Sequence, residues 1–349
     1  MSRLWFHHYQ LVPKNPGIPL REGALIRVET DSGFGYGDCH PWPEFTDMPL
    51  TFQLTLMEAI FAKVLSKEPV HRSESHRPLM CAAAEMALRC ALTDGKARIA
   101  GVQLIDPLVQ LPNHYSMPYG LGNGSDRAIN EELQCAKGLG FSIVKFKVNE
   151  YSTLDQVSRA YSAAGGLGFQ VRLDMNARLS YFEVEKLLLG LQFMNSDLSH
   201  LDWIEDPFPF DAEQYRQLKD QFGKKIAIDF VAPIDKVPTE SADVAIFKPG
   251  IQHIAAAELA LKKGFSVCVT SMLDHPLGQL WAHFQAQSLL KTSGDLDARV
   301  VPGGIASHFA YKSGPFSDQL LLKNTSLMPV QGTGLGFDDQ LGDLEWTPI

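Results

Sequence analysis

Short apolar runs alternate with amphipathic stretches through most of the chain from Tyr115 onward. The runs predict β-strands, and the stretches between them, where apolar residues recur three and four positions apart, predict helices. The predicted strands are 116–121, 142–148, 170–174, 201–205, 226–229, 244–248, 266–270 and 299–302. The predicted helices are 126–138, 154–164, 182–195, 211–221, 252–263 and 277–291. The segment 231–241 is short and contains proline, which argues against a helix there.

Repeated strand–helix units imply parallel strands joined by right-handed crossovers. An open doubly wound sheet would need a glycine fingerprint after its first strand, and Pro118–Gly124 matches one only loosely. Charged residues at the ends of many successive strands instead favour a closed (β/α)-barrel, a modified TIM barrel. We therefore predict a barrel domain over residues 116–310.

The first part of the chain has a different pattern. The runs 4–11 and 24–30 predict a strand hairpin, 35–46 predicts an irregular loop, and 50–66 and 77–95 predict helices. These elements predict an α+β capping domain over residues 1–115, with residues 311–349 packing back on it. The glycine-rich segment 327–337 lacks the Lys-Ser/Thr of a phosphate loop, so we expect a turn there that packs on the capping domain.

Composition narrows the class of protein. With 20% charged and 45% hydrophobic residues, the 349-residue chain is typical of globular proteins, and its length suits two domains. The net charge of −9 argues against nucleic acid or an anionic membrane as a partner. Five widely spaced cysteines without a CxxC predict free thiols, and no signal peptide or membrane span is visible. We expect a cytoplasmic protein, monomeric or homo-oligomeric, that acts on a small molecule.

Two lysines lie on one face of the predicted strand 142–148. Lys145 and Lys147 are two positions apart, so their ammonium groups point the same way from an apolar strand, which is unfavourable unless anions lie nearby. Carboxylates follow at later strand ends, together with a third lysine, and these are Asp174, Glu205, Asp229 and Lys248. The carboxyl ends of barrel strands meet at one face, so the set predicts an active site.

Simpler explanations exist for each residue alone. The Lys-x-Lys pair suits a solvated strand edge, Asp174 and Asp229 suit helix caps, and Glu205 suits a turn. Five such residues at successive strand ends favour the active site. Three carboxylates without a neighbouring cysteine or paired histidine predict an all-oxygen site for Mg²⁺, with Mn²⁺ as a possible substitute. A divalent cation beside lysines suits removal of a proton next to a carboxylate, with an amine as the base.

The ordered motifs resemble the enolase superfamily, in the branch that holds muconate-lactonizing enzymes, dipeptide epimerases and o-succinylbenzoate synthases. The matching motifs are Lys145-Phe-Lys147, Arg172-Leu-Asp-Met-Asn176, Trp203-Ile-Glu-Asp-Pro207, Ala227-Ile-Asp229 and Phe247-Lys248-Pro249. The resemblance implies that Asp174, Glu205 and Asp229 bind Mg²⁺. It further implies that Lys147 takes the α-proton, that Lys145 tunes it and touches the substrate carboxylate, and that Lys248 stabilises the intermediate from the opposite side.

Within this branch the chain most resembles the o-succinylbenzoate synthases of menaquinone biosynthesis. The segments that carry this resemblance are Gly35–Phe45, Asn123-Gly124 and Thr270–Asp274 followed by Leu277-Gly278. It implies dehydration of 2-succinyl-6-hydroxy-2,4-cyclohexadiene-1-carboxylate through an enediolate. Asn176, Asn123, Ser271 and Asp274 are then expected to contact the substrate, and Arg21 is a candidate for an anionic group, although a surface role suits it equally.

Two positions depart from that pattern. Phe230-Val231 replaces the usual Glu-Ser after the third acid, and Asp274 replaces a usual Glu. Dipeptide epimerases carry an Asp-x-Asp at the last barrel strand. Asp295-Leu-Asp297 has this form but precedes the predicted strand 299–302, so an epimerase or N-succinylamino acid racemase is the second candidate. A catalytically inactive binding protein is the third, and it is disfavoured because the acids and lysines are all present.

Overall fold

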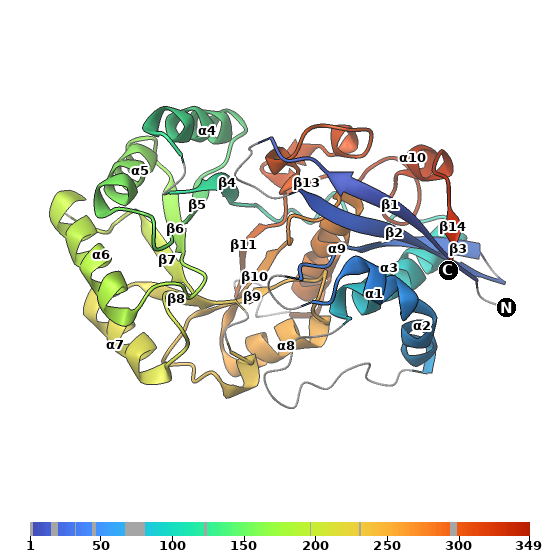
Figure 1. Ribbon diagram of the computed structural model, residues 1–349, viewed down its shortest axis with the longest axis horizontal. Helices are drawn as coiled ribbons and strands as arrows, with labels where there is room; N and C mark the ends of the chain where they lie inside the picture. The colour runs from blue at the N-terminus through green and yellow to red at the C-terminus, as the bar shows by residue number, and fades with distance from the viewer. Residues whose placement is uncertain are drawn as a thin grey trace.

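The computed structural model describes residues 3–14, 20–31, 33–43, 47–66, 81–121, 124–195, 197–229, 232–293 and 299–349. Figure 1 shows a parallel-stranded barrel with helices around its outside and, beside it, an antiparallel sheet with its own helices. Within the described ranges, no helix is both long and apolar enough to cross a bilayer. All five cysteines are free thiols.

Eight strands form the barrel sheet, in the order β11-β10-β9-β8-β7-β6-β5-β4, and each described pair is parallel. The strands are β4 (Tyr115–Gly120), β5 (Ile143–Lys147), β6 (Gln170–Asp174), β7 (Leu201–Glu205), β8 (Lys225–Ile228), β9 (Val244–Phe247), β10 (Ser266–Thr270) and β11 (Val300–Gly304). The predicted barrel is confirmed, because each predicted strand corresponds to one of these.

Six helices follow the first seven strands. They are α4 (Asp126–Gly138), α5 (Leu154–Gly166), α6 (Tyr181–Asn195), α7 (Ala212–Phe222), α8 (Ile254–Lys263) and α9 (Pro276–Ser293). Among the described residues between β8 and β9, the one regular element is the short 3₁₀ helix η1 (Ile234–Lys236), as the proline-containing sequence predicted. Side-chain caps begin α4, α5 and α7, where Ser125, Thr153 and Asp211 accept hydrogen bonds from the first turn.

The barrel closes between β4 and β11 through a short seam. Asn113 forms a parallel bridge with Gly303, and the His114 backbone N–H donates to the Gly303 carbonyl at 2.6 Å. The Asn113 side chain adds to this seam, because its Oδ1 accepts from the Ile305 N–H at 2.7 Å. Short bridges and one buried amide therefore join the first strand to the last.

The second sheet is antiparallel, in the order β14-β1-β2-β3. It comprises β1 (Arg3–Leu11), β2 (Arg21–Thr30), β3 (Gly33–Cys39) and the C-terminal β14 (Thr347–Pro348). Helices α1 (Leu50–Thr55), α2 (Met57–Ser66) and α3 (Ala82–Ile99) complete the cap. The prediction of an irregular loop over 35–46 was wrong for residues 35–39, which belong to β3. The prediction of a helix start at 77 falls on residues 77–80, which lie outside the described residues.

Two glycines explain why β3 was missed. A Cβ on Gly35 would lie 2.1 Å from the Ala91 carbonyl oxygen, and one on Gly37 would lie 1.9 Å from that of Ala87. Glycine is therefore needed at both positions for β3 to lie against the backbone of α3. A strand that packs through glycines has no apolar alternation, and so its sequence resembles a loop.

The C-terminal segment contacts α3 and the residues that follow it. The buried Asp94 of α3 accepts from the N–H groups of Tyr36 at 2.9 Å and Leu335 at 2.7 Å. The Gly334 N–H donates to the Val102 carbonyl at 2.9 Å. Short elements lie along this segment, namely η3 (His308–Ala310), η4 (Ser317–Gln319), β12 (Leu322–Lys323), β13 (Ser326–Leu327) and α10 (Asp338–Gly342).

Candidate active site

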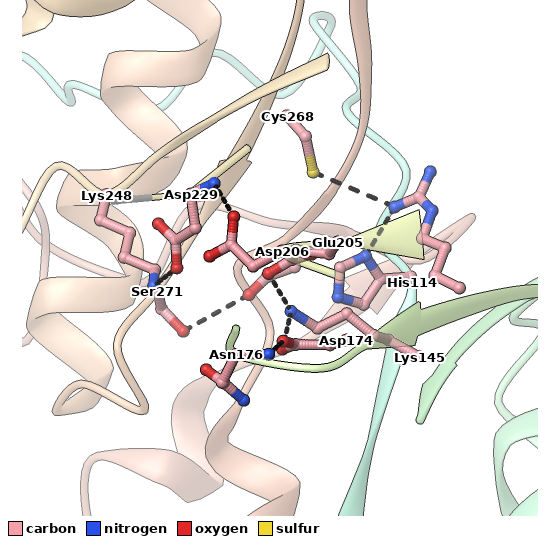
Figure 2. A network of polar contacts seen from close by, with 12 residues as sticks. His114, Lys145, Asp174, Asn176, Glu205, Asp206, Asp229, Lys248, Cys268 and Ser271 are labelled. Atoms are coloured by element: carbon pink, nitrogen blue, oxygen red, sulfur yellow. Dashed lines mark hydrogen bonds and ion pairs between the residues drawn. The ribbon is translucent and has the colours of Figure 1, made fainter. Parts of the chain in front are cut away.

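Lys145 lies between two carboxylates at the carboxyl ends of neighbouring strands. Its Nζ is 3.0 Å from Asp174 Oδ2 and 2.9 Å from Glu205 Oε1 (Figure 2). The Lys145 side chain is 12% exposed, and burial alone would lower its pKa. The charges of Asp174 and Glu205 outweigh this effect, so the pKa of Lys145 is raised. Lys145 is therefore a fixed cation.

Lys147 is placed differently on the same face of β5. It lies at the carboxyl end of the strand, and its ammonium group makes no hydrogen bond or ion pair to any described residue. Loss of hydration lowers the pKa of the Lys147 amine, the charge of Asp174 opposes this, and the charges of Lys145 and Lys248 lower the pKa further. The net pKa of Lys147 is below its usual value, which suits an amine that must accept a proton.

The three acids are buried at the ends of β6, β7 and β8. The side chains of Asp174, Glu205 and Asp229 are 5%, 2% and 4% exposed. Burial raises the pKa of Glu205, and the charge of Asp174 adds to this increase. Burial also pushes the pKa of Asp174 upward, but the charges of Lys145 and Lys147 hold it below its usual value. Burial raises the pKa of Asp229 despite the opposing charge of Lys248.

Lys248 lies after β9, on the far side of the site from β5. Its Nζ forms an ion pair with Asp229 Oδ2, and Figure 2 shows the two side chains in contact. The Lys248 backbone N–H donates to Gln252 Oε1 at 2.7 Å, which fixes the turn. Phe230 and Val231, which replace the usual Glu-Ser, lie outside the described residues.

The donor set fits Mg²⁺ in its chemistry. Three carboxylates supply only oxygen ligands, and Glu205 Oε2 and Asp229 Oδ1 are buried without a hydrogen-bond partner. As the side chains lie, no group of three His, Cys, Asp or Glu residues in the described ranges could hold a metal ion. Ammonium groups engage these carboxylates instead, Lys145 between Asp174 and Glu205, and Lys248 beside Asp229. The lysines thus balance the charge that a divalent cation would otherwise balance.

Asp206 is a site residue that the sequence analysis treated only as part of a motif. It adopts a φ of 42°, is 1% exposed, and its Oδ1 accepts from the Asp229 N–H at 3.0 Å. Burial raises the pKa of Asp206 well above its usual value, and the charge of Asp229 adds to this effect. Asp206 therefore ties the end of β7 to the end of β8. The sequence feature that could have identified Asp206 as a site residue is its position directly after Glu205 at the end of the strand.

Two of the predicted substrate contacts lie at the same face of the barrel. Asn176 has a φ of 47° and follows Asp174, whose Oδ1 accepts from the Asn176 N–H at 3.2 Å. The Ser271 hydroxyl, after β10, donates to Ser307 Oγ at 2.8 Å. Figure 2 shows Asn176 near Asp174. Asn123 lies outside the described residues.

Arg21 and Asp274 lie between the cap and the barrel. Arg21 is buried in the cap sheet, where its guanidinium donates to His40 Nε2 at 3.2 Å and to the Pro41 carbonyl at 3.0 Å. It also stacks 3.9 Å over the ring of Trp42. Burial raises the pKa of Asp274 to about 6, while the Met272 N–H, Arg21 and Lys248 oppose this increase. A purely surface role for Arg21 is thus excluded.

The chain just after β1 contacts residues that follow β11, the last strand of the barrel. Pro13 forms an antiparallel bridge with Tyr311, and the Lys14 N–H donates to the Ala310 carbonyl at 2.9 Å. The cap also docks through Asp38, whose Oδ2 accepts from the His275 N–H at 3.2 Å. Residues 15–19 and 44–46 lie outside the described residues, as does Asp295-Leu-Asp297.

Solved structures of other proteins share this fold. An enolase-superfamily protein from Listeria innocua Clip11262 aligns with a TM-score of 0.74 at 17% identity, covering 100% of this chain and 98% of that one. The dipeptide epimerase from Enterococcus faecalis V583, solved with Mg and the dipeptide L-Leu-L-Tyr, aligns with a TM-score of 0.74 at 16% identity, covering 96% and 98%. The chain has the enolase-superfamily fold.

Sequence comparisons indicate a narrower group of similar proteins than the solved structures do. Residues 4–73 match the model of the o-succinylbenzoate synthase N-terminal domain. The o-succinylbenzoate synthase of Bdellovibrio bacteriovorus is 28% identical over 333 residues, which cover 93% of this chain and 91% of that protein. These findings confirm the resemblance inferred from the motifs: the chain is similar to enolase-superfamily proteins and, within them, most like o-succinylbenzoate synthases.

Proposed function

We propose that this protein is a Mg²⁺-dependent o-succinylbenzoate synthase. It would dehydrate 2-succinyl-6-hydroxy-2,4-cyclohexadiene-1-carboxylate to o-succinylbenzoate, as a cytoplasmic carbon–oxygen lyase of menaquinone biosynthesis. The match over residues 4–73 and the similarity to the Bdellovibrio synthase along 93% of the chain support this reaction over others of the same fold.

The observation that carries the proposal is the contrast between the two lysines of β5. Lys145 is ion-paired to Asp174 and Glu205, whereas Lys147 makes no such pair among the described residues and has a lowered pKa. Lys147 is therefore the proposed base. It removes the proton next to the substrate carboxylate and then returns it to the departing hydroxyl, which leaves as water.

The remaining residues would bind the metal ion or stabilise negative charge on the substrate. Asp174, Glu205 and Asp229 would bind Mg²⁺, and Mn²⁺ has the same preference for oxygen ligands. The bound cation supplies Lewis acidity, which makes the α-proton of a coordinated carboxylate easier to remove. Lys145 keeps a positive charge beside Lys147 and contacts the substrate carboxylate. Lys248, from the opposite side, stabilises the enediolate.

We also propose the division of labour between the two parts of the chain. Residues 1–115, together with 311–349, would form the cap, and residues 116–310 the catalytic barrel. Asn176, Ser271 and Asp274 would contact the substrate from the barrel, and Arg21 would act from the cap. The hydrogen bond from the Lys14 N–H to the Ala310 carbonyl supports this arrangement, because it joins the chain just after β1 of the cap to the last residue of the barrel.

The direct test is the ultraviolet-monitored dehydration of the cyclohexadiene substrate, with Mg²⁺ and then with excess EDTA. The proposal predicts turnover that EDTA abolishes and added Mg²⁺ restores. A folded, Mg²⁺-supplied protein without turnover would refute the synthase assignment.

Epimerisation is the second candidate, because Lys147 and Lys248 approach the site from different strands. Two amines on opposite sides of one carbon can remove a proton from one face and return it to the other. A screen of dipeptides and N-succinylamino acids for exchange of the α-proton in D₂O tests this candidate. Exchange without dehydration would favour an epimerase or N-succinylamino acid racemase.

A further inference from the structure

A buried arginine and a buried histidine lie inside the barrel below the acids, and neither has a role in the mechanism above. Arg172 is on β6, two positions before Asp174, so both side chains face the barrel interior. Arg172 and His114 are each 1% exposed. A charged group this deeply buried requires a full set of partners.

The guanidinium of Arg172 has such a set. Its Nε donates to Asp202 Oδ2 at 2.9 Å, and its Nη1 donates to the Pro302 carbonyl at 2.8 Å. Its Cζ lies 3.4 Å from the centre of the Trp203 ring. Arg172 therefore connects β6 and β7, which carry two of the acids, to β11 at the seam of the barrel.

The remaining contact of Arg172 determines the state of His114. Nη1 lies 2.6 Å from His114 Nδ1. A guanidinium only donates hydrogen bonds, so Nδ1 must accept, and the single proton of the neutral ring is on Nε2. Protonating Nδ1 would break this hydrogen bond and place an imidazolium against the guanidinium.

On the opposite side of the imidazole, Nε2 is closely packed and buried without a hydrogen-bond partner. The His114 backbone is bonded to Gly303, and a Cβ on Gly304 would lie 2.5 Å from His114 Nε2. The ring therefore occupies space that only glycine leaves open. Figure 2 shows His114 next to Lys145.

Two cations act on His114 among the described residues. Burial, the charge of Arg172 on β6 and the charge of Lys145 on β5 all lower the pKa of His114. Cys268 of β10, whose Sγ lies 4.0 Å from Arg172 Nη1, is the neighbouring thiol, and burial raises its pKa to about 11. It is therefore neutral near pH 7.

We propose that Arg172 is a positioning residue that locks His114 as the neutral Nε2–H tautomer below the acids. An imidazolium there would place a further positive charge against Arg172 and near Lys145. The charge of Arg172 itself is paired with Asp202, so the lock adds no unpaired cation. Only the catalytic consequence of the lock rests on the proposed function, because the tautomer is a property of the folded chain.

The test is ¹⁵N NMR of protein labelled in its 11 histidines, with the His114 signals assigned by their loss in His114→Gln. Wild type is expected to show His114 neutral and protonated on Nε2 from about pH 5.5 to about pH 8.5. A proton on Nδ1, or titration of His114 within that range, would overturn the proposal.

Arg172→Met keeps most of the side-chain volume and removes the donor. We expect both neutral tautomers of His114 in this variant, or its protonation at low pH. We also expect a fall in kcat of about 10-fold or more with a smaller change in KM, as is usual when a residue that orients site groups is lost. The control is Arg127→Met, which removes an arginine with an 89% exposed side chain.

The two proposals fail separately. A wild type with the predicted tautomer and no dehydration activity would refute the synthase and leave the lock intact. An active wild type whose His114 titrates would refute the lock alone. If Arg172→Met does not fold, the wild-type spectrum still decides.

Discussion

Asp274 allows a quantitative prediction, because a buried carboxyl whose pKa is raised makes stability depend on pH with a known sign. It is 2% exposed, its Oδ1 accepts from the Met272 N–H at 3.1 Å, and its Oδ2 is buried without a hydrogen-bond partner. Burial is the largest cause of the increase in its pKa from 3.8 to about 6. In the folded protein Asp274 therefore holds its proton more tightly than in the unfolded chain.

The stabilisation from this protonated carboxyl is fully present below pH 3.8 and is lost as the pH rises through about 6. One pKa unit corresponds to about 1.4 kcal/mol, so the loss amounts to about 3 kcal/mol by pH 8. Asp274→Asn has nearly the same shape, keeps an oxygen for the Met272 N–H, and does not ionise. The free energy of unfolding of the variant minus that of wild type should therefore rise by about 2.4 kcal/mol between pH 4 and pH 8, because the unfolded carboxyl is already partly ionised at pH 4.

The assay is urea unfolding of both proteins at these two pH values, followed by tryptophan fluorescence. Burial lowers the pKa of the neighbouring His275 to about 3, and because both proteins keep His275, its effect cancels in the difference. Asp343→Asn, at an exposed position, is the control and should show no such rise. A difference for Asp274→Asn that is the same at both pH values would refute the reasoning.

Three further predictions follow from the site and the cap. Lys145→Met removes a positive charge that lowers the pKa of Lys147, so the pKa of Lys147 should rise in the variant. The rising limb of kcat against pH should then move to higher pH. An unmoved limb would argue against Lys147 as the titrating base. Mg²⁺ at 100 times its Kd should stabilise wild type by about 2.7 kcal/mol in thermal melting, and Glu205→Gln should lose most of this stabilisation. Equal stabilisation of the two proteins would exclude Glu205 as a ligand. Gly37→Ala should destabilise the protein by at least about 2 kcal/mol in urea unfolding, because its Cβ would overlap the backbone of α3, whereas Gly138→Ala, with open space around it, should not.

The barrel was predictable because its determinants are local in sequence. Each strand is a short apolar run, and the charged residue that ends it identifies the end at which the site is built. Lys145, Asp174 and Glu205 were found this way, and the structure brings them together at 3.0 Å and 2.9 Å.

Other features depend on contacts between residues far apart in the chain. β3 packs through glycines rather than apolar side chains, so its periodicity is absent from the sequence. The contact between Arg172 and His114 joins residues 58 positions apart, and nothing local marks His114 as buried. The pairing of Lys248 with Asp229 and of Lys145 with two acids also follows only from the closed barrel.

The central claim is that Lys147 is the base of a Mg²⁺-dependent dehydration. The most direct test compares wild type and Lys147→Ala in the ultraviolet dehydration assay, with Mg²⁺ binding followed in parallel by thermal melting. We expect turnover by wild type, a loss of at least 10²- to 10⁴-fold in the variant, as for other general bases, and unchanged stabilisation by Mg²⁺. Retained turnover in Lys147→Ala would contradict the account.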